Sequence, residues 1–166
     1  MHPDHSSAQL RGNGHRLMSE YLKPSLDTKF HIDFDWWRQH NRKLRVHLSS
    51  RLCPQCQPQH AAESVREIDW VDPFTGEVKS VDGLWEVVRS CCSQAPDYIT
   101  PQTPLVFAVF LTFVANDNAP MTPVELQQAL GGNRPASTIL RTLNSREVFY
   151  GIRPVRAPVK RRRQPV

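Results

Sequence analysis

Apolar residues between positions 33 and 52 recur at the spacing of a helix. The pattern predicts one helix over this range, which Asp33 or Asp35 can cap and Pro54 ends. The face opposite the apolar stripe carries basic side chains without an acidic one between residues 38 and 51. It predicts a basic ridge formed by Arg38, Arg42, Lys43, Arg45 and Arg51.

The spacing changes to alternation in the next segment. Apolar and polar residues alternate over 68–71 and again over 77–81, and a turn at 73–76 separates the two runs. This pattern predicts a β-hairpin. Asp82 can cap the helix that follows, whose apolar positions share one face and comprise Leu84, Trp85, Val88 and Cys91 or Cys92.

Helical spacing returns in the last third of the chain. A helix from residue 105 to about 116 is apolar nearly all round, so neighbouring elements must enclose it. Thr103 and Pro104 provide its expected N-cap and first helical position. Thr122 and Glu125 have the spacing of a capping box, and the intervening proline fits the first helical position of a second helix.

A third helix and a short extended segment complete the pattern. The second helix runs to Leu130, where two glycines turn the chain, and a third helix is predicted from Pro135 to about Asn144. Residues 148–150 and 152–154, separated by Gly151, predict a compact strand or wing. Helices and short strands that follow one another in separate groups indicate the α+β class.

These elements divide the chain into four parts. Residues 1–29 are polar, lack periodicity and are expected to form a mobile arm. Residues 30–97 are expected to form a mixed α/β unit of helix, β-hairpin and helix. Three helices and the wing occupy 103–154, and 155–166 is a basic tail.

Four features of residues 103–154 occur together. They are Thr122-Pro123-Val124-Glu125-Leu126, the Gly131-Gly132 turn, the helix over 137–143 and the strand over 148–152. With them the segment resembles the winged helix-turn-helix superfamily. The resemblance implies that the helix over 134–144 binds DNA in the major groove. The expected contacts are Arg134, Ser137, Thr138, Arg141 and Asn144, with Arg146 and Arg153 gripping the phosphate backbone beside the wing.

The charge distribution supports a polyanionic partner. The net charge is +5, but from Pro104 onward nine Lys/Arg and three Asp/Glu give +6, so the preceding residues carry −1. Clustered positive charge attracts nucleic acid by releasing its counterions. Further candidate phosphate contacts are Arg38, Arg42 and Arg45 of the predicted ridge, and Lys160, Arg161, Arg162 and Arg163 of the tail.

The four cysteines predict a structural zinc site. Cys53 and Cys56 have the spacing at which two thiolates chelate one tetrahedral ion. Cys91 or Cys92 would supply the other half, with His60 as a fourth ligand. Both cysteines of the adjacent pair can bind one ion only if the helix ends there, because successive helical side chains point about 100° apart. Buried or free thiols, and a redox pair at 53–56, are the alternatives.

Other motifs limit the functional classes. The chain has no Gly-x-Ser-x-Gly, phosphate loop or dinucleotide fingerprint, so we expect no enzyme. It has no apolar run of membrane-spanning length and no signal peptide, so we expect a cytoplasmic protein. The main hypothesis is a DNA-binding transcription regulator, with DNA favoured over RNA.

Two alternatives use the same surfaces differently. One is an accessory RNA-binding or structural subunit of a ribonucleoprotein or polymerase assembly. The other is a protein-interaction adaptor that uses Phe149, Tyr150 and the acidic hairpin, because winged helices also serve as interaction modules. The sequence leaves the oligomeric state open.

Overall fold

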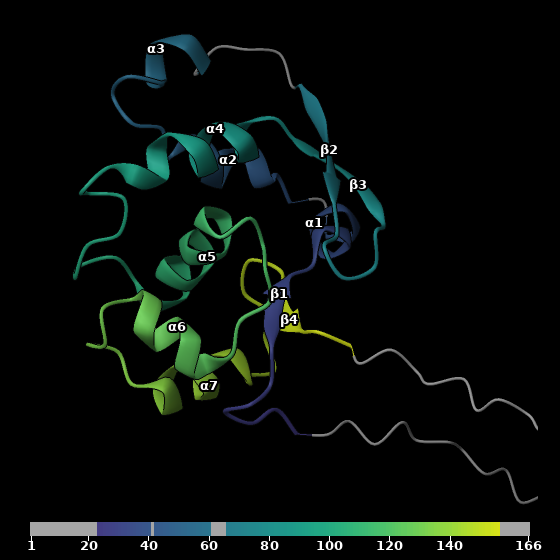
Figure 1. The fold of residues 1–166 in the computed structure, drawn as a ribbon, viewed down its shortest axis with the longest axis vertical. Helices are drawn as coiled ribbons and strands as arrows, with labels where there is room; N and C mark the ends of the chain where they lie inside the picture. The colour runs from purple at the N-terminus through teal and green to yellow at the C-terminus, as the bar shows by residue number, and fades with distance from the viewer. Residues whose placement is uncertain (1–22, 41, 61–65, 157–166) are drawn as a thin grey trace, which may run out of the picture.

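The computed structural model describes residues 23–40, 42–60 and 66–156 (Figure 1). Helices alternate with two small antiparallel sheets, so the α+β prediction is confirmed. The elements in chain order are β1(Phe30–Ile32), α1(Phe34–Gln39), α2(Leu44–Ser49), α3(Gln57–His60), β2(Glu67–Val71), β3(Val78–Asp82), α4(Leu84–Ser90), the 3-10 helix η1(Cys92–Gln94), α5(Leu105–Ala115), α6(Pro123–Ala129), α7(Ala136–Leu143) and β4(Ile152–Pro154).

Two short helices, α1 and α2, replace the single helix predicted over 33–52. Asp33 caps the first, as predicted, and its Oδ1 accepts hydrogen bonds from the main-chain N–H groups of Asp35 at 3.0 Å and Trp36 at 3.4 Å. Trp36 and Trp37 both lie in α1 and both are buried. The break between α1 and α2 turns the chain, so that Leu48 of the second helix also reaches the core.

The predicted hairpin and the helix after it are both present. Strands β2 and β3 pair in register from Glu67 opposite Asp82 to Val71 opposite Val78. Oδ1 of Asp82 accepts a hydrogen bond from Leu84 N at 2.9 Å, although the cap position itself is Gly83. Helix α4 buries its predicted apolar positions in the core.

Helix α5 lies in the middle of the ribbon, with α2 and α4 on one side and α6 and α7 on the other (Figure 1). Its residues from Ala108 to Val114 are all buried, as its uniformly apolar sequence predicts. Its N-cap is Pro104, one residue later than expected. Helix α6 begins with the predicted capping box, because Thr122 Oγ1 accepts from Glu125 N and Glu125 Oε2 accepts from Thr122 N.

The predicted strand pair over 148–154 is wrong in its first half. Only β4 is a strand, and its antiparallel partner is β1. Tyr150 and Gly151 both have positive φ, at 51° and 71°, and the hydrogen bond from Ile152 N to Phe149 O closes a tight turn. Two positive φ values at the centre of a turn are typical of type I′. This turn rests on α1, where Trp37 Nε1 donates to Tyr150 O at 3.1 Å.

Asn118 fastens β1 to the loop after α5. Its Oδ1 accepts from Ile32 N at 2.7 Å and its Nδ2 donates to Ile32 O at 2.9 Å, so the buried amide acts as a further strand partner. Phe30 of β1 also forms an isolated antiparallel β-bridge with Met121, in the loop before α6. The N-terminal strand is therefore held between the loop before α6 and the strand after α7.

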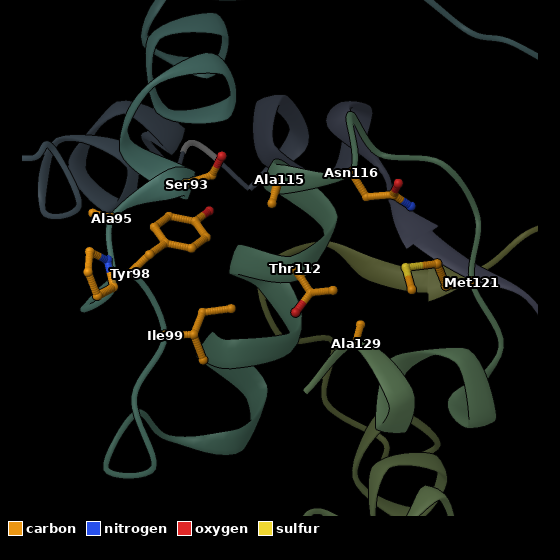
Figure 2. Close-up of a pocket in the computed structure, with 10 residues that line it drawn as sticks. Ser93, Ala95, Tyr98, Ile99, Thr112, Ala115, Asn116, Met121 and Ala129 are labelled. Carbon is orange, nitrogen blue, oxygen red and sulfur yellow. The ribbon is translucent and has the colours of Figure 1, made fainter. Parts of the chain in front are cut away.

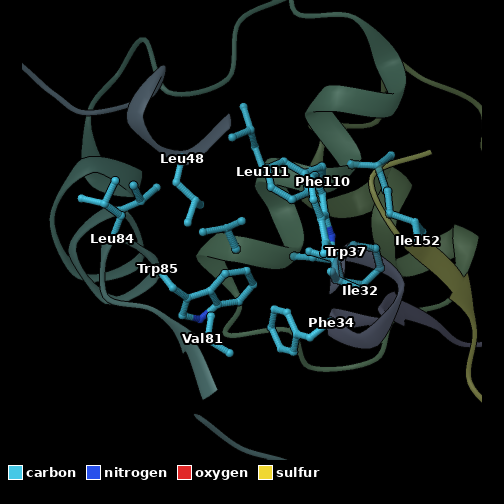
Figure 3. Packing of buried hydrophobic residues seen from close by; sticks show 14 of the residues in the cluster. Ile32, Phe34, Trp37, Leu48, Val81, Leu84, Trp85, Phe110, Leu111 and Ile152 are labelled. Carbon is cyan, nitrogen blue, oxygen red and sulfur yellow. The ribbon is translucent and has the colours of Figure 1, made fainter. Parts of the chain in front are cut away.

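The two predicted units share one apolar core. Leu48 and Trp85 from the first unit pack in the same buried cluster as Phe110 and Ile139 from the three helices. Figure 3 shows Leu48, Trp85 and Phe110 converging on this cluster. None of the helices within the described ranges combines the length and apolar character needed to cross a bilayer.

Candidate metal centre and nucleic-acid interface

The first two cysteines lie in the tight turn between α2 and α3. Pro54 prevents α2 from continuing, and the main-chain N–H groups of Cys56 and Gln57 both donate to Cys53 O at 2.9 Å. These bonds bend the chain back so that the two thiols of the pair point into one space. This is the local geometry that the Cys-x-x-Cys spacing predicts.

The second pair of cysteines lies where α4 ends. The α-helix stops at Ser90, Cys91 is its C-cap with φ −118° and ψ −63°, and the 3-10 helix begins at Cys92. The chain leaves regular α-helical geometry at Cys91, so the two thiols do not have the fixed divergence of adjacent residues within one α-helix. Both thiols therefore point into the same space. The helix ends at this pair, as the sequence requires if both cysteines are to bind one ion.

The four sulfur atoms form one compact cluster. All lie within 4.8 Å of one another, with Sγ of Cys91 at 3.4 Å from Cys56 and 4.0 Å from Cys53. Tetrahedral coordination at about 2.3 Å from a metal places sulfur atoms about 3.8 Å apart. The thiols are not joined as disulfides. The cluster is compatible with a single metal ion bound by four thiolates.

The fourth ligand is a correction to the sequence prediction. His60 does not belong to the cluster, which contains both members of the 91–92 pair instead of one cysteine and a histidine. His60 lies in the last position of α3, beyond the turn that carries Cys56. Because α4 ends at Ser90, both Cys91 and Cys92 contribute a thiol, and the cluster has four potential ligands without the histidine.

Hydrogen bonds already polarise the cluster. Cys53 N donates to Cys92 Sγ at 3.2 Å. The main-chain hydrogen bond from Cys56 lowers the pKa of the Cys53 thiol to about 7, whereas burial raises the pKa of the Cys56 and Cys92 thiols. Cys53 is thus a more readily ionised thiol than Cys56 and Cys92. A bound cation would favour the ionised form of the others.

Helix α7 exposes most of the side chains predicted to contact nucleic acid. Ser137, Arg141 and Asn144 are exposed and Thr138 is half-buried. The opposite side buries Ala136, Ile139 and Leu143. Residues 137, 141 and 144 follow at intervals of four and three, so they share one face of the helix.

Arg134 faces the body of the protein. Its Nη2 donates to main-chain oxygens of the turn before α5, at 2.5 Å to Thr103 and at 3.4 and 3.5 Å to Pro101 and Thr100. The guanidinium thereby fastens the start of α7 to the start of α5. It would have to give up these bonds to contact nucleic acid.

The other arginines predicted to contact nucleic acid differ in whether they are exposed or already contact other side chains of the protein. Arg146 is exposed, whereas Arg153 forms an ion pair with Asp33 at 3.3 Å. In the predicted ridge, Arg38 pairs with Asp35 and Arg45 with Asp82, and the guanidiniums of Arg42 and Arg51 lie over the rings of Trp36 and Phe107. These engaged side chains do not form one continuous free face. The tail residues Lys160, Arg161, Arg162 and Arg163 lie outside the described residues.

A pocket of about 450 Å³ is lined by residues from the segment after α4, from α5 and from the end of α6 (Figure 2). Its polar groups are already used by the fold, because Tyr98 Oη donates to Leu111 O at 2.8 Å and Thr112 Oγ1 to Ala108 O at 2.8 Å. Alanines and Met121 supply much of the remaining lining. The hydroxyls of Tyr98 and Thr112 therefore stabilise the fold, and we assign no ligand to this pocket.

Sequence reasoning missed a carboxylate that positions the two indoles of the first unit. Oδ1 of Asp117 accepts from Trp70 Nε1 at 3.2 Å and from Trp85 Nε1 at 2.9 Å. Asp117 has φ 51°, and it joins the hairpin and α4 to the loop after α5. An Asn-Asp-Asn loop signals a turn but not its distant partners.

Comparison of the chain with models of known families, with curated proteins and with solved structures found no match.

Proposed function

We propose that the protein binds duplex DNA through a helix-turn-helix formed by α6 and α7, and that one zinc ion stabilises it. The observation that carries the DNA-binding proposal is the division of α7 into two faces. One face packs through Ile139 and Leu143, and the other offers Ser137, Arg141 and Asn144 to solvent. A recognition helix needs this division, because it must be held by its partners while its polar side chains enter the major groove.

The exposed side chains have the chemistry for such contacts. Arginine binds guanine through two hydrogen bonds, and asparagine can do the same with adenine, while serine bonds bases or phosphates. The net charge of +6 from Pro104 onward provides attraction to the phosphate backbone. Regulation of transcription is the setting that this combination favours. The structural role of Arg134 moves the centre of the proposed contact from the start of α7 to Arg141.

Zinc is the metal that the donor set favours. Four thiolates in a tetrahedral arrangement are typical of structural zinc, and four protein ligands leave no position open for a substrate. The ion would join the end of α2 to the end of α4. Because α4 packs on α5, the ion would also hold the first unit against the helices that carry the DNA-binding face.

A selection from a pool of randomised DNA duplexes, followed by fluorescence polarisation, tests the DNA-binding proposal. We expect Arg141→Ala to weaken binding to the selected duplex by about 1–3 kcal/mol and to reduce its salt dependence. Arg66→Ala removes the same charge from an exposed site before the hairpin and is the matched control. Selection of no sequence, equal loss in both variants, or preference for structured RNA competitor would reject the proposal.

Metal analysis of protein purified without chelator tests the zinc assignment. We expect one zinc per chain, which Cys53→Ser or Cys92→Ser should remove. Stoichiometric iron, or no bound metal in folded protein, would contradict it. A negative result in the metal analysis would not affect the proposed DNA contacts of α7, which the fluorescence polarisation experiment tests independently.

A further inference from the structure

The end of the β2–β3 hairpin exposes three large apolar side chains. Val71, Phe74 and Val78 are 56%, 71% and 57% exposed. Val71 and Val78 are partners in the strand register, so their side chains lie on the same face. Phe74 is in the turn between them. These three residues are called the hairpin tip below.

Hydrogen bonds fix the shape of the hairpin tip. Oδ1 of Asp72 accepts from Phe74 N at 2.8 Å and Thr75 N at 3.2 Å, and Asp72 O accepts from Gly76 N at 2.9 Å. Gly76 supplies the positive φ of 70° that the turn requires. The main chain thus presents Phe74 outward in a defined position. An ordered, exposed aromatic side chain can enter a partner's pocket with little further loss of conformational freedom.

Acidic side chains surround the hairpin tip. Glu67 and Asp69 lie on the same face as Val71, and Glu77 precedes Val78. Trp70 and Val81 on the other face are buried. Lys79 shares that inner face and is engaged with Asp35 at 2.7 Å and Glu77 at 3.2 Å. The outward face of the two strands therefore combines apolar and negative side chains.

The hairpin tip and the exposed face of α7 serve different partners. Figure 1 shows the hairpin and α7 at well separated parts of the ribbon. Negative charge around the hairpin tip repels both DNA and anionic lipid. A protein surface of opposite charge is the partner that fits this chemistry.

We infer that the hairpin tip docks to another protein, whose surface offers an apolar pocket bordered by lysine or arginine. Phe74 enters the pocket and the paired valines cover its edge. The carboxylate of Asp69, on the same face as Val71 and Val78, faces the basic border, where it guides association and orients the complex. A convex turn with one prominent aromatic residue requires a concave partner, and a flat or acidic surface cannot match it.

Photo-crosslinking identifies the partner. The full-length chain carries p-benzoylphenylalanine at Phe74, or at Val46 as the control, and is irradiated in its native host cells. Val46 is a comparably exposed apolar residue on α2. We expect one cross-linked protein from position 74 that position 46 does not give, with the cross-linked peptide in an apolar pocket bordered by basic residues. No product above the Val46 control, or a second copy of this chain as the only product, overturns the inference.

Binding to that protein in purified form then tests the chemistry. We expect Phe74→Ala to weaken the complex about tenfold or more, and the charge-reversed variant Asp69→Lys to weaken it at low salt. Val46→Ala should bind like the wild type. Equal affinity of the Phe74→Ala variant, or tighter binding by the charge-reversed variant, refutes the proposed mode. DNA binding by Phe74→Ala should be unchanged, which keeps this test separate from that of α7.

Discussion

The part of the chain before α5 and the three helices α5–α7 differ in what determines their structure. Helices α1, α2 and α4 have six, six and seven residues, nearly as few as α6 and α7 with seven and eight, and isolated helices this short are not stable in water. What differs is the kind of contact that stabilises each part. Contacts between distant residues hold α1, α2 and α4, including the cysteine cluster and the Arg45–Asp82 ion pair at 3.0 Å. Their geometry is a property of the assembled molecule.

The structure of α5, α6 and α7 depends more on signals in the local sequence. Helix α5 has 11 residues with almost no polar position, and α6 begins with a complete capping box. Two glycines with φ near +80° turn the chain before α7. Loss of one distant contact should therefore destabilise the first part more than loss of one local signal destabilises the three helices. Four substitutions test this difference.

The largest effect is expected from removing a cysteine of the cluster. Cys56→Ser should prevent metal binding and lower the free energy of unfolding by about 5 kcal/mol or more, because a structural metal site contributes directly to folding. Amide hydrogen exchange should increase most in α2 and α4 and least in α6 and α7. Val46→Ala on the exposed side of α2 is the control. Uniform loss of protection in all helices would show that the two parts do not differ.

Asn118→Ala should have the next largest effect, since this residue connects the two parts. It leaves the buried N–H and C=O of Ile32 without their partner, which costs about 3–4 kcal/mol in the free energy of unfolding measured by denaturant titration. Asn118→Gly removes any strain at φ 58° and should lose nearly as much. Asn116→Ala is the exposed control, and a similar loss there would contradict the role of Asn118.

Gly151→Ala tests how closely the turn after α7 approaches α1. A Cβ at this position would meet Trp37 Nε1 at 2.8 Å and Asp33 O at 3.0 Å, and φ is +71°. We expect a loss of about 2–3 kcal/mol in thermal or denaturant unfolding. Gly131→Ala has the same backbone strain with open space around it, and it should cost about 1 kcal/mol. Equal losses would mean that the contact with α1 is unimportant.

The sequence predicts the elements whose signals are local. Thr122 and Glu125 mark the start of α6 correctly, and Asp33 marks that of α1. The Cys-x-x-Cys spacing indicates half of the cysteine cluster, but the other half depends on where α4 ends. That position decides which way the adjacent thiols point, and no single residue signals it.

Pairing between distant segments could not be predicted in the same way. Strand β4 has β1 as its partner, more than one hundred residues earlier in the chain, and residues 148–154 contain nothing that excludes a local hairpin. Arg134 has the appearance of a DNA contact at the start of an amphipathic helix. Its bonds to the main chain of residues 100–103 depend on how α5 and α7 pack.

The smallest effect is expected from Thr122→Ala, which removes the best local signal in the chain. Loss of one N-cap side chain costs about 1 kcal/mol, and packing of Leu126 should still hold α6 in place. Thr122→Ser retains the hydroxyl and should behave like the wild type. Hydrogen exchange should increase only in the first turn of α6, with zinc content and binding to the selected duplex unchanged. If Thr122→Ala instead cost as much as Asn118→Ala, the helices would depend on their caps as strongly as the first part depends on its distant contacts, and the distinction between the two parts would fail.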